Sequence, residues 1–242
     1  GDYGDWQAAG NDGWGYDRVA PVFDRLESPH PDTPDAPFLS VSDESADFHD
    51  LSGDFVDICA EGQLPADSVA RREGAGVGPY LTTTRNGMRC SSAVAFLWPA
   101  MRRANLTVIT GAHVESIGFA GRRADSVTYR HRGASHTVRA GREILLAAGA
   151  VGSPQLLQVS GVGDVAHLRG LGIDVVHDLP QVGRHLQDHF GINYIFKANR
   201  KTLNDVFGTW HGRVMCGLDY LFRRRGPLAL SVNQYGGLVK SS

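Results

Sequence analysis

The chain contains several groups whose types and spacing could support chemistry. His185 and His189 lie four residues apart in HLQDH, the spacing of two zinc ligands on one face of a helix. The zinc-protease pattern needs Glu directly after the first His, but Leu186 stands there and no third ligand is evident. Serine-hydrolase chemistry is less well supported still, because G-x-S-x-G is absent and Pro154 after Ser153 prevents a nucleophile elbow. We therefore predict neither a metal site nor a catalytic serine.

Two stretches match the glycine spacing of a dinucleotide-binding loop only formally. GAGVGPY, Gly74–Tyr80, has Pro79 in place of the third glycine, with no strand before it and no helix after it, so we predict a turn. Gly161-x-Gly163-x-x-Ala166 follows a helical pattern rather than a strand. A genuine G-x-G-x-x-G within a βαβ unit is not found in the sequence.

The most informative stretch is Glu143–Gly163. Ile144–Ala148 is apolar without alternation, which predicts a strand buried on both faces, and Gly149 should end that strand where another group can approach the backbone. Ser153 reads as an N-cap, and Pro154–Ser160 as a short helix. A strand, a glycine turn and a helix N-terminus can hold a nucleotide on main-chain groups. An ordinary strand-turn-helix packing unit is the alternative.

The amino-acid sequence of this stretch, AGAVGSPQLLQVSGVG, resembles the second signature of the glucose-methanol-choline (GMC) oxidoreductases. WGYDRVAPVFDRLES, GIDVVHDLPQVGRHLQDH and RRGPLALSVNQYGGLVKSS resemble further phrases of that family, although His185 replaces the commoner Asn. The resemblance covers nearly the whole chain and is that of an internal piece. The residues that stand where the signature has them are Gly152, Ser153, Pro154, Ser160, Gly161 and Gly163.

The resemblance implies an α/β fold with α+β character. The expected parts are an FAD-binding Rossmann-like domain that contains an antiparallel β-meander, and the start of a second, antiparallel-sheet, substrate domain. We predict a flavin-lid and surface segment with short helices at residues 1–105, part of the FAD-binding domain at 106–189, and the start of the substrate-binding domain at 190–242.

The cofactor implied by the resemblance is FAD, held covalently or non-covalently. In proteins of this family the residue matching Val114, in TGAHV, offers main-chain groups to the adenine. The turn matching Ala148 and Gly149 passes close to the adenosine half. Main-chain groups can recognise a base edge without a special side chain. The alternative for Val114 is a core-facing strand residue, and the two roles are compatible.

The implied reaction is oxidation of a primary alcohol, a CH–OH donor, to an aldehyde by hydride transfer to the flavin. None of the ten His residues matches the family's catalytic His, so we assign no catalytic residue here. We expect this fragment alone to be inactive and to hold FAD weakly. The electron acceptor, and the choice between oxidase and dehydrogenase, stay open. The alternative is a naturally short, non-catalytic flavoprotein-like module with a binding or structural role.

Gln234 bears on the substrate. In the choline-oxidising branch of the family a Glu stands at the matching position and faces the substrate's quaternary ammonium group. An amide attracts a cation less than a carboxylate does, so we predict a neutral alcohol as substrate. The alternative is that Gln234 only forms a hydrogen bond across strands.

Local patterns predict the elements that position these residues. Short alternating runs between Leu106 and Leu146 predict an antiparallel meander, and Asn86-Gly87 predicts a tight turn. Trp6 and Trp14 should hold the irregular Gly-rich segment Gly1–Gly15 together by packing. Predicted helices are Tyr16–Leu26, Phe55–Glu61 with Asp54 as cap, Asp164–Leu171 and Trp210–Arg223. Predicted strands are Ile173–Val176 and Ile192–Lys197.

Composition excludes several classes of function. The net charge of −2 gives no electrostatic footprint for nucleic acid. The sequence has no apolar run of about eighteen residues, so we predict no transmembrane segment. Three widely spaced cysteines, without a C-x-x-C pair, argue for a reducing compartment, and we predict a cytoplasmic location.

Overall fold

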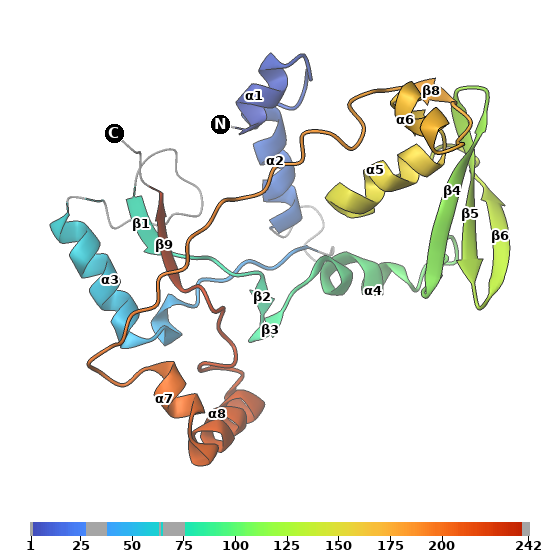
Figure 1. Ribbon diagram of the computed structural model, residues 1–242. Helices are drawn as coiled ribbons and strands as arrows, with labels where there is room; N and C mark the ends of the chain where they lie inside the picture. The colour runs from blue at the N-terminus through green and yellow to red at the C-terminus, as the bar shows by residue number, and fades with distance from the viewer. Residues whose placement is uncertain (1, 28–37, 63, 65–75, 239–242) are drawn as a thin grey trace. The chain divides into compact units, whose positions relative to one another are not determined.

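The computed structural model describes residues 2–27, 38–62, 64 and 76–238. The chain divides into two compact units, which Figure 1 allows the reader to follow by colour. One unit is made of Gly1–Leu106 and Phe196–Ser242, and the other of Thr107–Ile195. The first unit is thus built from both ends of the sequence and the second from its middle.

The second unit is built on a three-stranded antiparallel sheet with the order β4–β5–β6. β4 spans Ala112–Ala120, β5 spans Arg123–His131 and β6 spans Ala134–Arg139. Gly121 and Gly133 take left-handed φ angles in the two connecting turns, where a side chain would be strained. The predicted meander is confirmed in these three runs. β4 is an edge strand, so one side of its backbone pairs with no strand among the described residues.

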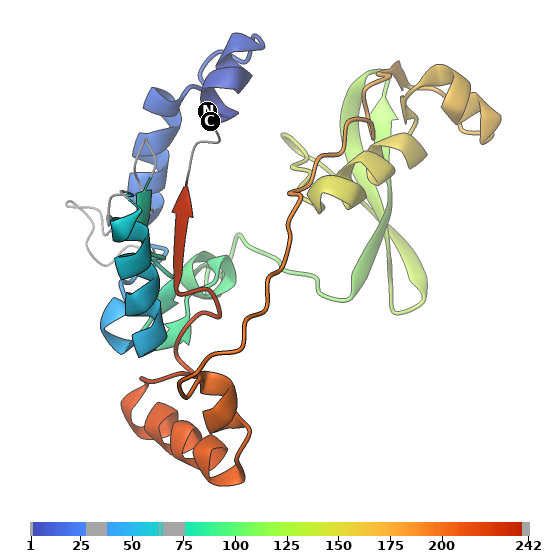
Figure 2. The same cartoon turned by 60° about the vertical axis from the view of Figure 1, so that its left-hand side comes forward.

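Helix α5, Gly149–Val159, packs against β4. The hydroxyl of Ser160 accepts a hydrogen bond from the Ile117 N–H at 2.8 Å and donates one to the Leu156 carbonyl at 2.6 Å. Figures 1 and 2 both show α5 on the β4 side of the sheet. Ser160 therefore fixes the C-terminal end of α5 to the edge strand.

A short unit of two strands and a connecting helix follows α5. β7, Val162–Gly163, pairs in parallel with β8, His177–Asp178, and α6, Val165–Gly170, connects them. The side chain of Leu168 in α6 is fully buried. The helix predicted at residues 164–171 is confirmed. The strand predicted at Ile173–Val176 is wrong in position, because pairing begins only at His177.

Ile144–Ala148 is not the buried strand that its composition predicts. The segment pairs with no strand among the described residues, and Leu145 is 82% exposed. The runs at 106–110 and 192–197 likewise form no strand, and Ile195 is 95% exposed. A strand exists only where a neighbour satisfies its backbone, and apolar composition alone cannot supply that neighbour.

The helix after this segment also begins earlier than predicted, at Gly149 rather than at Pro154. Ser153 is therefore not the N-cap. Its hydroxyl instead accepts a hydrogen bond at 3.1 Å from the N–H of Ala148, the residue that precedes the helix. Pro154 lies inside the helix and removes the one backbone bond that its missing N–H would have donated to Ala150.

In the first unit the N-terminal segment forms two helices, α1 (Asp2–Ala8) and α2 (Tyr16–Glu27). The Trp6 and Trp14 rings meet edge to face with centroids 5.8 Å apart, so packing of both rings is confirmed. The irregular segment predicted for residues 1–15 is wrong for Asp2–Ala8, which is helical. α2 begins at Tyr16 as predicted and ends one residue later than predicted, with Pro21 inside the helix.

A two-stranded antiparallel sheet joins distant parts of the first unit. β1, Gly76–Pro79, pairs with β9, Tyr235–Leu238, and α3, Asp50–Glu61, contacts β1. The turn predicted at 74–80 is therefore wrong for Gly76–Pro79, because the partner strand lies far along the chain; residues 74 and 75 lie outside the described part. α3 also begins earlier than predicted, with His49 rather than Asp54 as its cap.

The remaining elements of this unit follow local signals. Asn86 and Gly87 have φ angles of 53° and 67°, which confirms the predicted tight turn. Helix α8 spans Trp210–Arg223 as predicted, and the hydroxyl of its N-cap Thr209 accepts from the Gly212 N–H. The other elements are η1 (Ser45–Asp47), β2 (Thr84–Arg85), β3 (Met88–Arg89), η3 (Ala93–Leu97, a π-helix), α4 (Trp98–Ala100) and α7 (Leu203–Phe207). Within the described ranges no helix has the length and apolar character needed to cross a membrane.

Replacing Ser160 with Ala should destabilise the second unit by about 1–2 kcal/mol, because Ile117 loses the acceptor of its N–H. Urea unfolding and hydrogen exchange at the Ile117 amide measure the effect. Thr137→Ala, which removes one of two exposed hydroxyls that hydrogen-bond to each other, is the control and should change stability by less than about 0.5 kcal/mol. Unchanged protection of the Ile117 amide in Ser160→Ala would contradict this role.

Candidate functional site

The four residues predicted to bind ligands fall in different units. Val114, Ala148 and Gly149 belong to the unit of residues 107–195, and Gln234 belongs to the other unit. We therefore treat a cofactor-binding region and a substrate-binding region separately.

Val114 lies in β4 directly opposite Tyr129, and its side chain is 39% exposed. The register shifts between Val114 and Ser116, so Glu115 forms a bulge in the edge strand. A bulge at an edge redirects main-chain groups away from the regular ladder. Val114 thus lies beside a bulge of an edge strand, and its exposure shows that it does not belong to the core.

The Glu115 side chain beside this position is occupied by its own neighbours. Its carboxylate forms an ion pair with the Arg130 guanidinium and accepts from the Ser135 hydroxyl at 3.3 Å. The hydrogen bond from Arg130 lowers the pKa of Glu115, so the carboxylate stays charged at neutral pH. These contacts hold the bulge on β5 and β6 and leave only main-chain groups for a ligand.

Ala148 and Gly149 form the entry to α5. Gly149 has a φ of +81°, and a Cβ built there would meet no atom within 4 Å, so the backbone faces open space. Ala148 precedes the first turn of an eleven-residue helix, where free N–H groups and the helix dipole favour negative or acceptor groups. The fit to the adenosine half of FAD rests on this open backbone rather than on a cradle that encloses it.

Helix α5 connects the strand that carries Val114 with the turn that carries Ala148 and Gly149, but the strand and the turn are near opposite ends of the helix. Ser160, at the C-terminal end, is bonded to β4, whereas Gly149 is at the N-terminal end, about 16 Å away along the axis. Contact of Val114, Ala148 and Gly149 with one adenosine group stays a prediction.

Gln234 directly precedes β9 and borders a pocket of about 430 Å³. Its Oε1 accepts hydrogen bonds from the Ser52 hydroxyl at 2.7 Å and the His49 N–H at 3.1 Å. Its main-chain carbonyl accepts from the Tyr80 N–H at 2.9 Å. The described residues that line the pocket are His49, Leu51, Ser52, Phe55, Thr202, Leu203, Asn204, Val232, Asn233, Gln234 and Tyr235.

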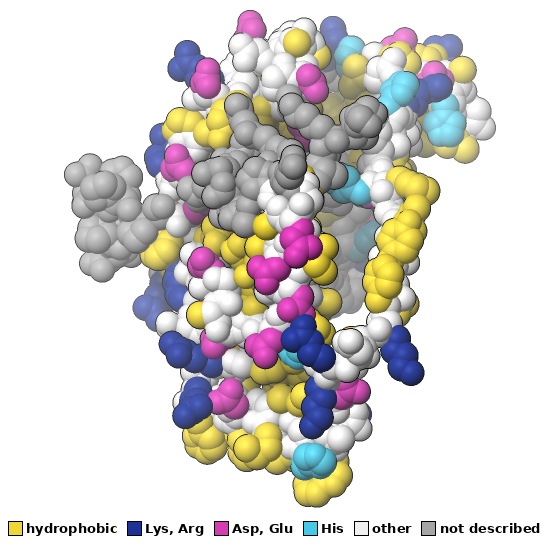
Figure 3. Space-filling model, turned by 90° about the vertical axis from the view of Figure 1, so that its left-hand side faces the viewer, with side chains coloured by type: hydrophobic (Ala, Val, Ile, Leu, Met, Phe, Trp, Pro, Cys, Tyr) yellow, Lys and Arg dark blue, Asp and Glu magenta, His cyan; other side chains and the backbone are white. Residues whose placement is uncertain are grey.

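Among the described residues that line the pocket there is no Asp, Glu, Lys or Arg. Asp54 of α3 forms an ion pair with Arg200, and neither residue is among those that line the pocket. Other acidic side chains of α3 gather on its outward face (Figure 3). The Asp205 carboxylate accepts from the N–H and the hydroxyl of Thr202, bonds that lower its pKa. The pocket therefore offers neutral polar groups between two helix N-termini.

Sequence reasoning found Gln234 but missed His49 and Ser52. They lie 185 and 182 residues away from it in the chain. Neither residue belongs to a recognisable motif, and no spacing within the sequence could have joined them to Gln234.

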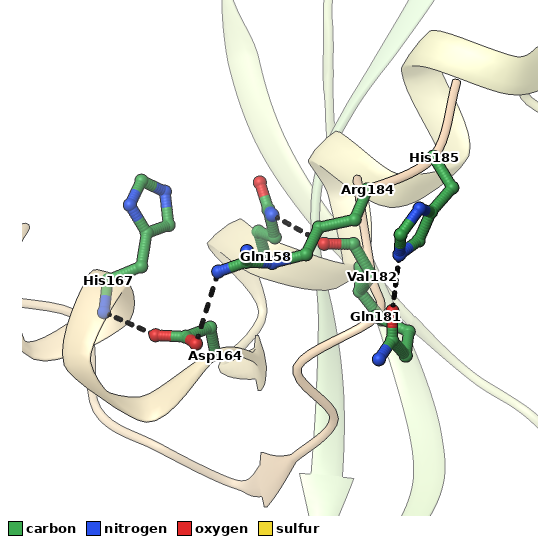
Figure 4. Close-up of polar contacts among 7 residues, drawn as sticks. All are labelled: Gln158, Asp164, His167, Gln181, Val182, Arg184 and His185. Atoms are coloured by element: carbon green, nitrogen blue, oxygen red, sulfur yellow. Dashed lines mark hydrogen bonds and ion pairs between the residues drawn. The ribbon is translucent and has the colours of Figure 1, made fainter. Parts of the chain in front are cut away.

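The first His of the HLQDH stretch makes a contact within the loop after β8. His185 takes a left-handed φ of +57°, a conformation that Asn adopts more readily, and its Nε2 lies 2.9 Å from the Gln181 Oε1 (Figure 4). Arg184 reaches the Asp164 carboxylate at 3.4 Å. In the part of the chain that the structure covers, no group of three His, Cys, Asp or Glu residues could hold a metal ion.

A family model described as GMC oxidoreductase matches residues 1–191. The chain is 39% identical to an alcohol dehydrogenase (acceptor) of Pseudomonas putida, across 100% of the chain and 45% of that protein. It is 36% identical to oxygen-dependent choline dehydrogenase 1 of Chromohalobacter salexigens, across 100% of the chain and 44% of that protein. The chain thus spans less than half of the length of these relatives.

Solved structures agree with the fold. A Chaetomium thermophilum FAD-dependent oxidoreductase superposes with a TM-score of 0.81 at 24% identity, over 97% of this chain and 44% of that one. Pyridoxine 4-oxidase from Mesorbium loti superposes with a TM-score of 0.65 at 32% identity, over 77% of this chain and 38% of that one. The first likeness supports the fold alone, and both agree with the predicted α/β class.

Gly149→Ala should destabilise the chain by about 1 kcal/mol, because a Cβ at a left-handed φ is strained even where space is open. Gly170→Ala is the matched control: a Cβ there also meets nothing within 4 Å, and Gly170 has no positive φ. The control should be neutral or slightly stabilising at the end of α6. Equal unfolding midpoints for the two variants would show that Gly149 needs no special backbone.

Acid should weaken the start of α6 through Asp164. The His167 N–H donates to its Oδ1 at 2.9 Å, and this bond lowers the Asp164 pKa below 3.8. The stabilisation is fully present above pH 3.8 and is lost as pH falls through the lowered pKa of the folded state. Thermal unfolding of Asp164→Asn, which keeps an uncharged cap, should lack this acid-dependent loss. An identical pH dependence of unfolding in the unaltered chain and in Asp164→Asn would contradict this role of the Asp164 carboxylate.

Proposed function

Because the chain belongs to the GMC oxidoreductase family, we propose that it is part of an FAD-dependent enzyme that oxidises a primary alcohol to an aldehyde. We further propose that a neutral alcohol is preferred over choline. The names of its relatives, an alcohol dehydrogenase and choline dehydrogenases, support alcohol oxidation in general. The described part of this chain supplies binding groups, and we assign it no catalytic residue.

We assign Val114, Ala148 and Gly149 to the adenosine half of FAD. The open backbone at Gly149 and the bulged edge strand at Val114 support this assignment. Bound FAD supplies the hydride acceptor for the reaction. The residues of this chain contribute orientation: a fixed edge strand on one side and the N-terminal end of α5 on the other.

The neutral lining of the pocket beside Gln234 is the single observation that carries the substrate preference. A quaternary ammonium ion has no hydrogen-bond donor and is bound by carboxylates or aromatic faces. Phe55 and Tyr235 line the pocket, but aromatic faces also bind the ring or chain of an uncharged alcohol. Without a carboxylate in the lining, uncharged alcohols gain relative to choline.

The whole protein that contains this chain, loaded with FAD, should oxidise aliphatic or benzylic alcohols with a higher kcat/KM than choline. Gln234→Glu should raise the kcat/KM for choline by about three- to fivefold, the value of a partly exposed ion pair of about 1 kcal/mol. The measurement is flavin reduction followed by absorbance under anaerobic conditions, with each alcohol in turn. A strong preference for choline in the unaltered protein would overturn the neutral-alcohol proposal.

A further inference from the structure

The amide of Gln234 is held in one orientation. Two donors, the Ser52 hydroxyl and the His49 N–H, both point at its Oε1, so the carbonyl end of the amide must occupy that place. An inverted amide would place an NH₂ group against both donors. The Nε2 therefore lies on the side away from α3.

This Nε2 is available to a ligand. It has no hydrogen-bond partner among the described residues, and within them no buried side-chain nitrogen or oxygen lacks a partner. The Nε2 is therefore accessible to solvent at a residue that borders the pocket. It offers two N–H donors and no acceptor.

The imidazole of His49 offers a second donor at the same pocket. Its Nδ1 accepts from the Leu51 N–H at 3.2 Å as the cap of α3, so the neutral ring carries its proton on Nε2. His49 also lines the pocket, and no described residue accepts from its Nε2. The α3 cap and the Gln234 anchor thus fix two side chains with their donors free.

We propose that this pocket binds an alcohol with an uncharged hydrogen-bond acceptor, such as a ring nitrogen or a carbonyl oxygen, which accepts from Gln234 Nε2. His49 Nε2 is the second donor to the same kind of group. The apolar side chains of Phe55 and Leu203 border the pocket for the body of the ligand. The inference deepens the proposed function and rests on it for the ligand being an alcohol substrate.

The test compares two alcohols of the same shape. 4-Pyridinemethanol has a ring nitrogen acceptor where benzyl alcohol has a C–H, and at mildly alkaline pH both are uncharged. Each is titrated into the chain, with the Gln234 side-chain amide followed by ¹H–¹⁵N NMR. We expect 4-pyridinemethanol to bind about three- to tenfold more tightly, the effect of one net hydrogen bond, and to shift the Gln234 amide signal.

Gln234→Glu removes the donor but keeps an oxygen for Ser52 and the His49 N–H, so it should abolish the difference between the two alcohols. Gln155→Glu, the same change at an exposed residue of α5 in the other unit, is the matched control and should keep the difference. Equal binding of both alcohols by the unaltered chain, or a difference that persists in Gln234→Glu, overturns the inference. If Gln234→Glu unfolds, the Gln234 amide shift in the unaltered chain decides between these outcomes.

Failure of the proposed function looks different. A flavin-loaded whole protein that oxidises no alcohol would refute alcohol oxidation while leaving the measured preference for an acceptor intact. Oxidation of both alcohols with equal kcat/KM and equal binding would refute the acceptor preference alone.

Discussion

The hydroxyl of Ser160 joins the parts on which the candidate cofactor region depends. It accepts from the edge strand β4 and donates within α5, so one side chain satisfies groups of two elements. An edge strand otherwise presents unpaired main-chain groups along its length. Ser160 thus fixes one end of α5 to the strand that carries Val114, while Gly149 lies at the other end of the helix.

Near the pocket beside Gln234, too, one side chain satisfies polar groups of another element. The Oε1 of Gln234 accepts from two donors at the N-terminus of α3, the His49 N–H and the Ser52 hydroxyl. The side chain of Gln234 thus bonds to the start of α3 and not across strands, so its oxygen has a structural role. Recognition of a ligand by its nitrogen is our proposal. A side chain with two polar ends can serve stability and binding at once.

Elements fixed by local signals could be predicted from the sequence. The Asn86-Gly87 turn, the β4–β5–β6 meander and α8 depend on residues within a few positions of one another, and all three were confirmed. Elements that need distant partners could not be predicted. β1 was mistaken for a turn because β9 pairs with it from the other end of the chain. Ile144–Ala148 was mistaken for a buried strand because composition reports what can be buried and not what is present to cover it.

The extended segment after the HLQDH stretch has a consequence for handling the molecule. Phe190 is 93% exposed and Ile195 is 95% exposed. The backbone of this segment pairs with no strand among the described residues. Such a surface attracts like segments of other molecules through both backbone pairing and the hydrophobic effect. A Lys substituted at one of these exposed positions should weaken such pairing in concentrated solutions of this chain.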